Sequence, residues 1–392
     1  MINVAIIGTG NISAFHIKGY LTFPDRCRIV ALVDIYPEKA EKKKEEYGLT
    51  HATVYDSHKD MLDREDIDLV SICTPPYVHA SISMDCMRSG MNVLCEKPMA
   101  SSLEECDAMI KTSEETGRTL GIVAQNRFRT QIMNLKKTLD SGLIGDMVWA
   151  DVDSFWWRGH SYYDLWWRGT WEKESGGCTL NHAVHHIDML NWMMGGVPKK
   201  VSAVLGNVSH DNSEVEDISV ATLQYADGSM GRVTSSLLHH GEDQKIEFHG
   251  TKARIAAPWN VTASCSKSNG FPDKNVELEQ ELTRYYEALP VFKYEAHTGE
   301  IEDVLSALDK GTRPLITGES GRNTIELITA IYKAGFEERT VELPIGKDDP
   351  WYTAEGIMKN VRHFNEKTTF LENFTDQNIS TGSNYKYRYE HI

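Results

Sequence analysis

The first third of the chain alternates short, mostly apolar segments with segments in which apolar residues recur at helical spacing. The apolar segments predict strands at residues 2–7, 28–34, 69–73, 92–95 and 120–124, and the intervening segments predict helices at 13–21, 37–47, 77–88 and 103–115. A strand that is apolar on both faces must be covered on both faces, as in a parallel sheet between helices. The pattern therefore predicts an α/β domain over residues 1–124, built on a parallel sheet.

A glycine-rich turn, Gly8-x-Gly10-x-x-Ser13, joins the first predicted strand to the first predicted helix. Gly8 permits a tight turn and Gly10 lets the backbone approach a pyrophosphate at the helix N-terminus, as in a Rossmann dinucleotide-binding domain. Asp34 ends the second strand, where its carboxylate would accept hydrogen bonds from the adenosine ribose and repel a 2′-phosphate. These residues predict NAD rather than NADP; the alternative is a glycine turn in a domain that binds another ligand.

The pattern changes after about residue 146, where longer strands are joined by hairpin-like turns. Strands are predicted at 147–157, 200–209, 218–225, 229–238 and 244–249, with one strong helix over 179–194 and later helices at 298–308 and 321–337. We expect an α+β domain over residues 125–358 with a largely antiparallel open sheet, which binds the substrate and supports oligomerisation. Its open sheet face would join a homo-oligomer, a dimer or a tetramer, and residues 359–392 would form a C-terminal arm or tail.

Composition excludes several classes of partner. The net charge of −16 argues against a general affinity for nucleic acid or acidic membranes. The seven cysteines include no Cys-x-x-Cys pair, which favours a reducing compartment. The chain has no apolar run of about 18 residues and no signal-peptide pattern at its start. We therefore expect a cytoplasmic protein that binds neither nucleic acid nor membrane.

Four motifs together are more specific than the glycine turn alone. They are Gly8-x-Gly10, Thr74-Pro75 with His79, Glu96-Lys97-Pro98, and the segment GGCTLNHAVHHID at residues 176–188. Their order and spacing, within roughly residues 1–358, resemble the glucose–fructose oxidoreductase, inositol dehydrogenase and MocA family (Gfo/Idh/MocA). The resemblance implies an NAD-dependent oxidoreductase acting on carbohydrates.

The resemblance also implies that Lys97 lies beside the nicotinamide and the substrate hydroxyl, with a peptide bond before Pro98 that is often cis. The carboxyl ends of parallel strands are where α/β domains bind ligands, and an ammonium there would stabilise a forming alkoxide. A lysine that merely caps a strand end is the alternative. The cofactor-binding residues implied are Gly8, Gly10, Asn11, Ile12, Asp34, Thr74, Pro75, His79, Glu96, Lys97, Gln125, Trp167 and Arg168.

By the same resemblance, His185 is the general base that accepts the proton of the substrate hydroxyl, within the histidine's normal titration range. Asn181 lies four residues earlier, on the same face of the predicted helix. The family commonly has aspartate there, and an amide can orient a hydroxyl but cannot relay a proton. His182 and His186 with Asp188 could be metal ligands, but hydride transfer needs no metal and none is expected.

Residues 155–171, FWWRGHSYYDLWWRGTW, contain five of the nine tryptophans. Indole rings pack on the C–H faces of sugars while charged and amide groups bind hydroxyls, so the segment predicts a carbohydrate pocket. For any single ring, a place in the core or in a subunit interface is the alternative. The substrate-binding residues expected are Arg127, Trp157, Arg158, Trp167, Asn181, His182, His185, Tyr294 and His297.

The expected reaction is reversible oxidation of a secondary hydroxyl of a pyranose or glycoside to a keto sugar, with hydride transfer to NAD. Three alternatives remain open: an inositol (cyclitol) dehydrogenase, a lyase or glycosidase that oxidises its substrate transiently with tightly bound NAD, and a sensing protein that has lost turnover.

Overall fold

The computed structural model describes residues 1–64, 66–372 and 374, which form two compact units. Unit 1 contains Met1–Phe128, Lys293–Ile325 and Tyr352–Ile357, and unit 2 contains Arg129–Phe292, Glu326–Trp351 and the described residues from Met358 onward. The sequence prediction places all of 125–358 in one domain, whereas the structure assigns three segments of that range, 125–128, 293–325 and 352–357, to unit 1.

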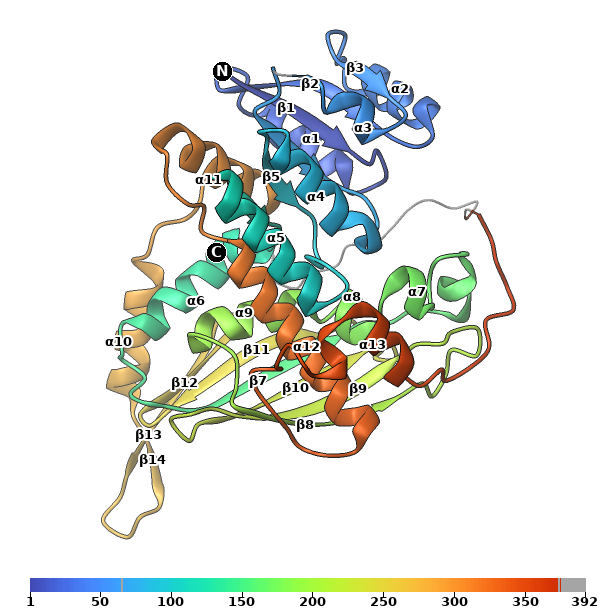
Figure 1. The fold of residues 1–392 in the computed structure, drawn as a ribbon. Helices are drawn as coiled ribbons and strands as arrows, with labels where there is room; N and C mark the ends of the chain where they lie inside the picture. The colour runs from blue at the N-terminus through green and yellow to red at the C-terminus, as the bar shows by residue number, and fades with distance from the viewer. Residues whose placement is uncertain (65, 373, 375–392) are drawn as a thin grey trace. The chain divides into compact units, whose positions relative to one another are not determined.

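Unit 1 is built on a parallel six-stranded sheet with the order β3-β2-β1-β4-β5-β6, which confirms the predicted Rossmann class (Figure 1). The strand order reverses between β1 and β4, and such a switch point is where open α/β sheets bind ligands. The strands are β1 (Ile2–Ile7), β2 (Cys27–Val33), β3 (Thr53–Tyr55), β4 (Leu69–Ile72), β5 (Asn92–Cys95) and β6 (Leu120–Ile122).

Some helices of unit 1 begin at residues that favour a helix N-terminus. Helix α2 has Pro37 in its first turn, and the N–H of Glu105 donates to the hydroxyl of Ser102, the N-cap of α5. The helices are α1 (Ser13–Leu21), α2 (Pro37–Glu46), α3 (His58–Met61), α4 (His79–Arg88), α5 (Leu103–Thr116) and the later α11 (Ala296–Lys310), with short 3₁₀ turns η1 (Pro76–Val78) and η2 (Gln125–Phe128).

The returning helix α11 completes the core of unit 1. Its side chains Ile301, Val304 and Leu305 are buried in the same apolar cluster as Ile6 of β1 and Ile17 of α1. Burial of side chains this large stabilises a fold by about 1.5–3 kcal/mol each. This packing explains why residues 293–325 belong to unit 1 although they follow most of unit 2 in the sequence.

Unit 2 is built on a nine-stranded sheet with the order β14-β13-β12-β11-β7-β10-β9-β8-β15, in which only β7 and β10 pair in parallel among the described strands. The largely antiparallel sheet is as predicted. Its strands are β7 (Met147–Phe155), β8 (Lys200–Gly206), β9 (Ile218–Gln224), β10 (Met230–Ser236), β11 (Gln244–Gly250), β12 (Ala253–Ala257), β13 (Asn260–Ser266), β14 (Pro272–Lys274) and β15 (Val341–Glu342).

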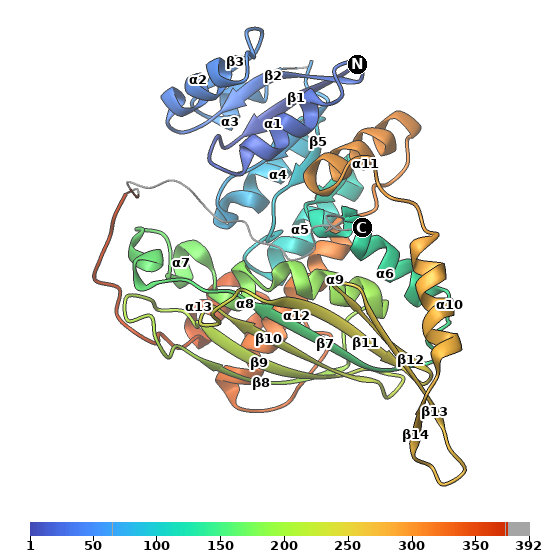
Figure 2. The ribbon, with the colours of Figure 1, turned by 180° about the vertical axis from the view of Figure 1, so that it is seen from behind.

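One face of this sheet is covered by short helices, and Figure 2 shows α8 and α9 lying along it. The opposite face presents exposed apolar side chains, Val204, Val220 and Met230, beside Arg232, which bonds Asp151 and Asp153 of β7. The helices of this unit are α6 (Thr130–Asp140), α7 (Trp171–Glu174), α8 (Cys178–Asn181), α9 (Val184–Met194) and α10 (Val276–Glu287). Two further helices, α12 (Gly318–Glu337) and α13 (Ala354–Asn360), begin with residues of unit 1 and end with residues of unit 2. The 3₁₀ turns are η3 (His160–Asp164) and η4 (Pro350–Tyr352).

The single helix predicted over residues 179–194 is wrong, because the segment divides into α8 and α9 at His182 and Ala183. The amide nitrogen of Asn181 donates to the carbonyl oxygens of Gly176 and Gly177, at 2.7 and 3.3 Å, and so turns back on its own segment. Such local side-chain bonds compete with continuation of a helix. Asn181 and His185 are therefore in two different helices.

The described part of the predicted C-terminal arm packs on unit 2. The N–H of Leu371 donates to the carbonyl of Asp164 at 2.7 Å, the N–H of Trp166 donates to the carbonyl of Leu371 at 2.9 Å, and Lys367 is buried. The remainder of the predicted arm lies outside the described residues. Within residues 1–64, 66–372 and 374, no helix combines the length and hydropathy that a membrane span requires.

Candidate active site

The turn after β1 approaches the end of β4 so closely that only glycine fits at its first position. Gly8 has a φ of +88°, and a Cβ there would lie 2.7 Å from the carbonyl oxygen of Cys73. Gly10 is exposed, and no atom lies within 4 Å of its Cβ position. A pyrophosphate can reach the N–H groups at the start of α1 only if no side chain blocks its approach, and Gly10 leaves that approach open. Asn11 and Ile12 follow Gly10 in the same turn.

The carboxylate of Asp34 is fixed at the end of β2. Its Oδ2 accepts hydrogen bonds from the N–H and the hydroxyl of Thr9, at 2.8 and 2.7 Å, and its Oδ1 accepts from the N–H of Tyr36 at 3.0 Å. The next side chains, Ile35 and Tyr36, are 77% and 50% exposed. A held carboxylate beside exposed apolar surface suits the ribose and the base of an adenosine.

Two buried oxygens follow β4 and β6, the strands on either side of β5. Thr74 Oγ1 and Gln125 Oε1 are buried and have no hydrogen-bond partner among the described residues. A buried polar atom left unsatisfied costs about 1–3 kcal/mol, which a bound polar ligand would recover. Together with the glycine turn and Asp34, these atoms show that unit 1 fits a dinucleotide.

Lys97 follows β5, between the ends of β4 and β6 in the sheet. It is half-buried, its peptide bond to Pro98 is cis, as the resemblance implied, and its backbone N–H donates to Glu96 Oε2 at 3.0 Å. The backbone of this lysine is thus held by the side chain of the residue before it.

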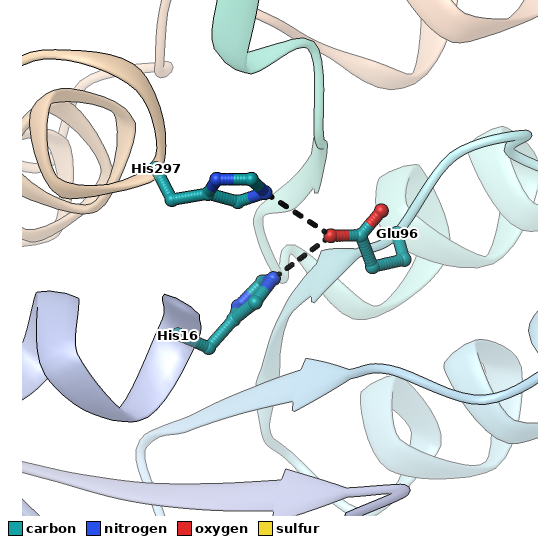
Figure 3. A group of neighbouring side chains, drawn as sticks. All are labelled: His16, Glu96 and His297. Atoms are coloured by element: carbon teal, nitrogen blue, oxygen red, sulfur yellow. Dashed lines mark hydrogen bonds and ion pairs between the residues drawn. The ribbon is translucent and has the colours of Figure 1, made fainter. Parts of the chain in front are cut away.

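Glu96 is itself held by two histidines (Figure 3). His16 Nε2 of α1 donates to Glu96 Oε1 at 3.0 Å, and His297 Nε2 of α11 lies 3.5 Å from the same oxygen, an ion-pair distance. The three side chains are at most 9% exposed. Although burial acts to raise it, the hydrogen bonds from His16 and His297 hold the pKa of Glu96 well below its usual range, so the carboxylate is charged.

His79 links the two strand-end segments that contain Thr74 and Lys97. It is fully buried, with Nδ1 2.8 Å from the carbonyl oxygen of Pro98 and Nε2 2.8 Å from that of Thr74. Burial lowers the pKa of this imidazole. Because both ring nitrogens contact backbone, His79 orders the two segments that flank the predicted nicotinamide position.

In unit 2, the predicted base His185 is half-buried in the first turn of α9. Its neighbour His186 is 1% exposed, and burial lowers the pKa of His186 to about 3, which keeps that ring neutral. The preceding helix α8 is anchored to the sheet, because Thr179 Oγ1 and Ser219 Oγ of β9 share a hydrogen bond of 2.8 Å. Because His186 is buried and His185 is only half-buried, His185 is the more accessible of these two adjacent histidines.

His182 contacts a polar and aromatic cluster formed by residues of the predicted sugar-binding segment and by Glu174. Arg168 Nη1 donates to the hydroxyl oxygen of Tyr162 and to Glu174 Oε1, the latter at 3.1 Å, and Tyr162 Oη lies 3.4 Å from His182 Nε2. The guanidinium of Arg168 also lies over the ring of Trp167, 4.3 Å from its centroid. Tyr162 and Glu174 were not predicted as site residues, although Tyr162 lies in the aromatic segment that indicated the pocket.

The tryptophans of that segment divide into core and surface residues. Trp171 is buried against Tyr332, whereas Trp156 packs edge-on against His182 with centroids 5.6 Å apart. Trp157 is 46% exposed, and the adjacent Arg158 forms an ion pair with Glu242. The alternative of a core position thus holds for Trp171 and not for Trp157.

Three other predicted substrate residues lie in unit 1. Arg127 is 3% exposed in η2. Tyr294 packs edge-on against Phe23 at 5.0 Å, on the apolar core, and His297 joins Glu96. The cluster with metal-ligand spacing among the described residues is His16, Glu96 and His297, rather than the group of His182, His186 and Asp188 considered from the sequence.

Comparisons with known proteins agree with this geometry. Residues 2–123 match the family model "Oxidoreductase family, NAD-binding Rossmann fold", and residues 132–256 match the GFO/IDH/MocA C-terminal domain. The chain is 28% identical to inositol 2-dehydrogenase of Rhizobium meliloti, over 87% of this chain and 99% of the relative, and 26% identical to 2,7-anhydro-N-acetylneuraminate hydratase of Mediterraneibacter gnavus, over 87% and 96%.

Among solved structures, the WlbA dehydrogenase of Bordetella pertussis in complex with NADH and UDP-GlcNAcA superposes with a TM-score of 0.75 at 28% identity, covering 88% of this chain and 98% of that one. The glycine turn, Asp34 and the strands of the parallel sheet lie within the region matched by the first family model. The chain belongs to the Gfo/Idh/MocA family of NAD-binding oxidoreductases.

Proposed function

We propose that this protein oxidises a secondary hydroxyl of a pyranose or glycoside to a keto sugar, with NAD as the cofactor. The observation that supports this most strongly is the position of Lys97. It lies at the carboxyl end of β5, its backbone is fixed by Glu96, and the unsatisfied oxygens of Thr74 and Gln125 follow the two neighbouring strands. A lysine whose backbone is fixed at a predicted nicotinamide position suits stabilisation of an alkoxide by its ammonium group.

In this proposal, NAD supplies the acceptor for the hydride. Its pyrophosphate would be held by the backbone of residues 8–12, its adenosine ribose by Asp34, and its nicotinamide end by Thr74, Pro75 and Gln125. His79 and Glu96 would act by ordering the backbone, since neither side chain is exposed by more than 4%. Trp167 and Arg168 remain proposed cofactor neighbours on the strength of the family resemblance.

The chemical step would be a deprotonation coupled to loss of hydride. His185 would accept the hydroxyl proton, and the Lys97 ammonium would stabilise the negative charge that develops on the oxygen. Asn181 would orient the sugar rather than relay the proton, because its amide has no titratable group. In the reverse direction, His185 would return the proton to the carbonyl oxygen.

The substrate would be bound mainly by the aromatic segment of unit 2. Trp157 offers an exposed indole face, and the cluster of Arg158, Arg168, Tyr162 and His182 offers donors and acceptors for hydroxyl groups. Arg127, Trp167, Tyr294 and His297 complete the set proposed from the sequence. The contacts of Tyr294 and His297 within unit 1 favour a supporting role for both.

A second candidate is a reaction without net redox change, in which the hydride taken from the substrate is returned to it within one turnover. The observation that favours it is the relation to 2,7-anhydro-N-acetylneuraminate hydratase, which extends over 87% of this chain. Inositol oxidation is a third candidate, because a relative of similar identity is an inositol 2-dehydrogenase.

We also propose a cytoplasmic homo-oligomer. Six of the seven cysteines are buried free thiols, which fits a reducing compartment. The face of the unit 2 sheet opposite α8 and α9 pairs exposed Val204 of β8 with exposed Val220 of β9, so two copies could bury this face against each other. Sedimentation equilibrium of the wild type and a Val204→Lys/Val220→Lys variant would test this interface.

The proposed activity is tested by nicotinamide reduction. Purified protein with NAD, and separately NADP, is offered monosaccharides, methyl and aryl glycosides, inositols and 2,7-anhydrosialic acid, beside Lys97→Ala and His185→Ala. Reduction of NAD on one sugar class, lost in both variants, is the expected result. Conversion of a substrate without net reduction, together with NAD released on denaturation, would favour the second candidate. Binding of NAD with no conversion of any compound would contradict both.

A further inference from the structure

The cluster of His16, Glu96 and His297 joins three distant parts of the chain (Figure 3), and its carboxylate belongs to the residue that directly precedes Lys97. Its carboxylate divides its two oxygens between two tasks. Glu96 Oε1 faces the two imidazoles, at 3.0 and 3.5 Å, and Glu96 Oε2 accepts the N–H of Lys97 at 3.0 Å. The side chain that fixes the lysine backbone is thus itself fixed from two helices.

Hydrogen bonds extend this arrangement into the core of unit 1. His16 Nδ1 lies 3.2 Å from Ser71 Oγ of β4, and Ser71 Oγ lies 2.7 Å from the hydroxyl of Tyr20. His16 is 0% and Ser71 0% exposed. A second-neighbour bond of this kind orients an imidazole, so the edge that His16 presents to Glu96 is determined by the fold.

This arrangement is not explained by stability alone. A buried ion pair loses much of its attraction to desolvation, and well-packed apolar residues of similar volume are often as stable or more stable. Apolar side chains lie next to the two histidines in the helices that present them, Ile17 in α1 and Ile301 in α11. The charged cluster therefore points to a task that apolar residues could not perform.

We infer that Glu96 is a positioning residue for Lys97, and that His16 and His297 hold its carboxylate in the orientation that accepts the Lys97 N–H. The inference rests on the proposed function for the catalytic role of Lys97, but the held backbone is independent of it. His79 restrains the same segment from the other side, through the carbonyl oxygen of Pro98. The backbone is thereby held at the N–H of Lys97 by Glu96 and at the carbonyl of Pro98 by His79.

Three variants separate positioning from packing. Glu96→Met removes the acceptor and keeps the volume. Glu96→Gln is the conservative variant, because its amide oxygen can accept the Lys97 N–H while its NH₂ group donates to a neutral imidazole. The triple variant His16→Leu/Glu96→Met/His297→Leu replaces the whole cluster with apolar groups. It provides a second test if Glu96→Met, which leaves both histidines buried, fails to fold. Val304→Ala, in the same core, serves as the control for lost stability.

Two measurements are made on each full-length variant. The first is hydrogen exchange of the Lys97 amide, by NMR with ¹⁵N-lysine labelling, which requires neither substrate nor activity. The second is steady-state kinetics with NAD affinity measured separately. We expect faster Lys97 exchange in Glu96→Met and the triple variant, and a kcat lower by about 100-fold, the usual effect of a displacement of about 1 Å. NAD affinity should change by less than about threefold, and Glu96→Gln should restore most of kcat.

Several outcomes would overturn the inference. It fails if Lys97 exchange in Glu96→Met equals that of the wild type, or if kcat per folded molecule is lost no more than in Val304→Ala. It also fails if the purified wild type contains one equivalent of zinc that is absent from the triple variant, because the three side chains would then be a metal-ligand set. Faster exchange in a protein whose wild type oxidises no substrate would support the positioning role and refute the proposed function.

Discussion

Asp34 Oδ2 accepts two hydrogen bonds from one residue, the N–H of Thr9 at 2.8 Å and the Thr9 hydroxyl at 2.7 Å. The residue within the glycine turn thus orients the carboxylate predicted to bind the ribose. The same contact joins the end of β2 to the turn after β1, so the predicted phosphate and ribose sites are fixed relative to each other within unit 1.

This contact makes cofactor choice testable. Replacing Asp34 with serine and Ile35 with arginine would remove the carboxylate that repels a 2′-phosphate and supply a cation at the exposed next position. A charged hydrogen bond contributes about 1.5–3 kcal/mol, so kcat/KM for NAD should fall by about 10- to 100-fold and activity with NADP should appear. Ile35→Arg alone, with the carboxylate present, is the control and should keep its preference for NAD. An unchanged preference in the double variant would contradict the ribose role of Asp34.

The two glycines of the turn should fail in different ways. Gly8→Ala places a methyl group 2.7 Å from the Cys73 carbonyl at a φ of +88°, and backbone strain of this kind costs about 1–3 kcal/mol before the clash is added. Gly10→Ala meets no atom within 4 Å and should leave the unfolding midpoint in urea nearly unchanged, while NAD affinity falls by about tenfold or more because the methyl group occupies the pyrophosphate approach. Equal NAD affinity in Gly10→Ala and the wild type would place the dinucleotide elsewhere.

The first sheet could be predicted because each of its longer strands is a continuous apolar run between helices. Strand β3 escaped prediction, since a three-residue strand at a sheet edge has too few apolar positions to show a pattern. The break between α8 and α9 also escaped, because neither glycine nor proline marks it. It is created by Asn181 bonding back to Gly176 and Gly177, in a loop whose N–H groups are held by Glu216 from elsewhere in the chain.

The local geometry of the candidate site was predictable where one segment contains a whole motif, as in the glycine turn and the cis Lys97–Pro98 bond. Contacts between distant positions were not. His297 lies about 200 residues after Glu96 in the sequence, and only the return of α11 to unit 1 brings them together. His16 gave no signal of its own, because a single histidine within a helix is usually a packing residue.

The guanidinium of Arg168 contacts Tyr162, Glu174 and Trp167. Arg168→Lys keeps the charge but cannot reproduce the planar fork, so we expect a rise in the sugar KM of about tenfold with a smaller effect on NAD affinity. Arg168→Met should also destabilise the fold by about 3–5 kcal/mol, because the buried Glu174 would lose its partner. Isothermal titration with the substrate, and urea unfolding, would measure the two effects. Equal sugar binding by wild type and Arg168→Lys would remove Arg168 from the pocket.

Glu216 should make stability depend on pH. It is 0% exposed below α8, where its carboxylate accepts the N–H groups of Thr179 and Gly177, at 2.9 and 3.1 Å, and the hydroxyl of Tyr332 at 3.1 Å. Burial raises the pKa of Glu216 from 4.5 to about 7, although these hydrogen bonds oppose the rise. The folded state therefore binds more protons than the unfolded state between these values. The stabilisation is complete below pH 4.5 and is lost as the pH rises through 7, about 3 kcal/mol in total.

Urea unfolding of the wild type and Glu216→Gln between pH 5 and pH 8 measures this effect, because all other titrating groups are common to both proteins. Relative to Glu216→Gln, the free energy of unfolding of the wild type should fall by roughly 2–3 kcal/mol from pH 5 to pH 8. The exposed Glu277→Gln serves as the control for a carboxylate lost from the surface, and its curve should run parallel to that of the wild type. A pH-independent difference between Glu216→Gln and the wild type would mean that the hydrogen bonds, rather than burial, determine the charge of Glu216 beneath the segment that holds Asn181.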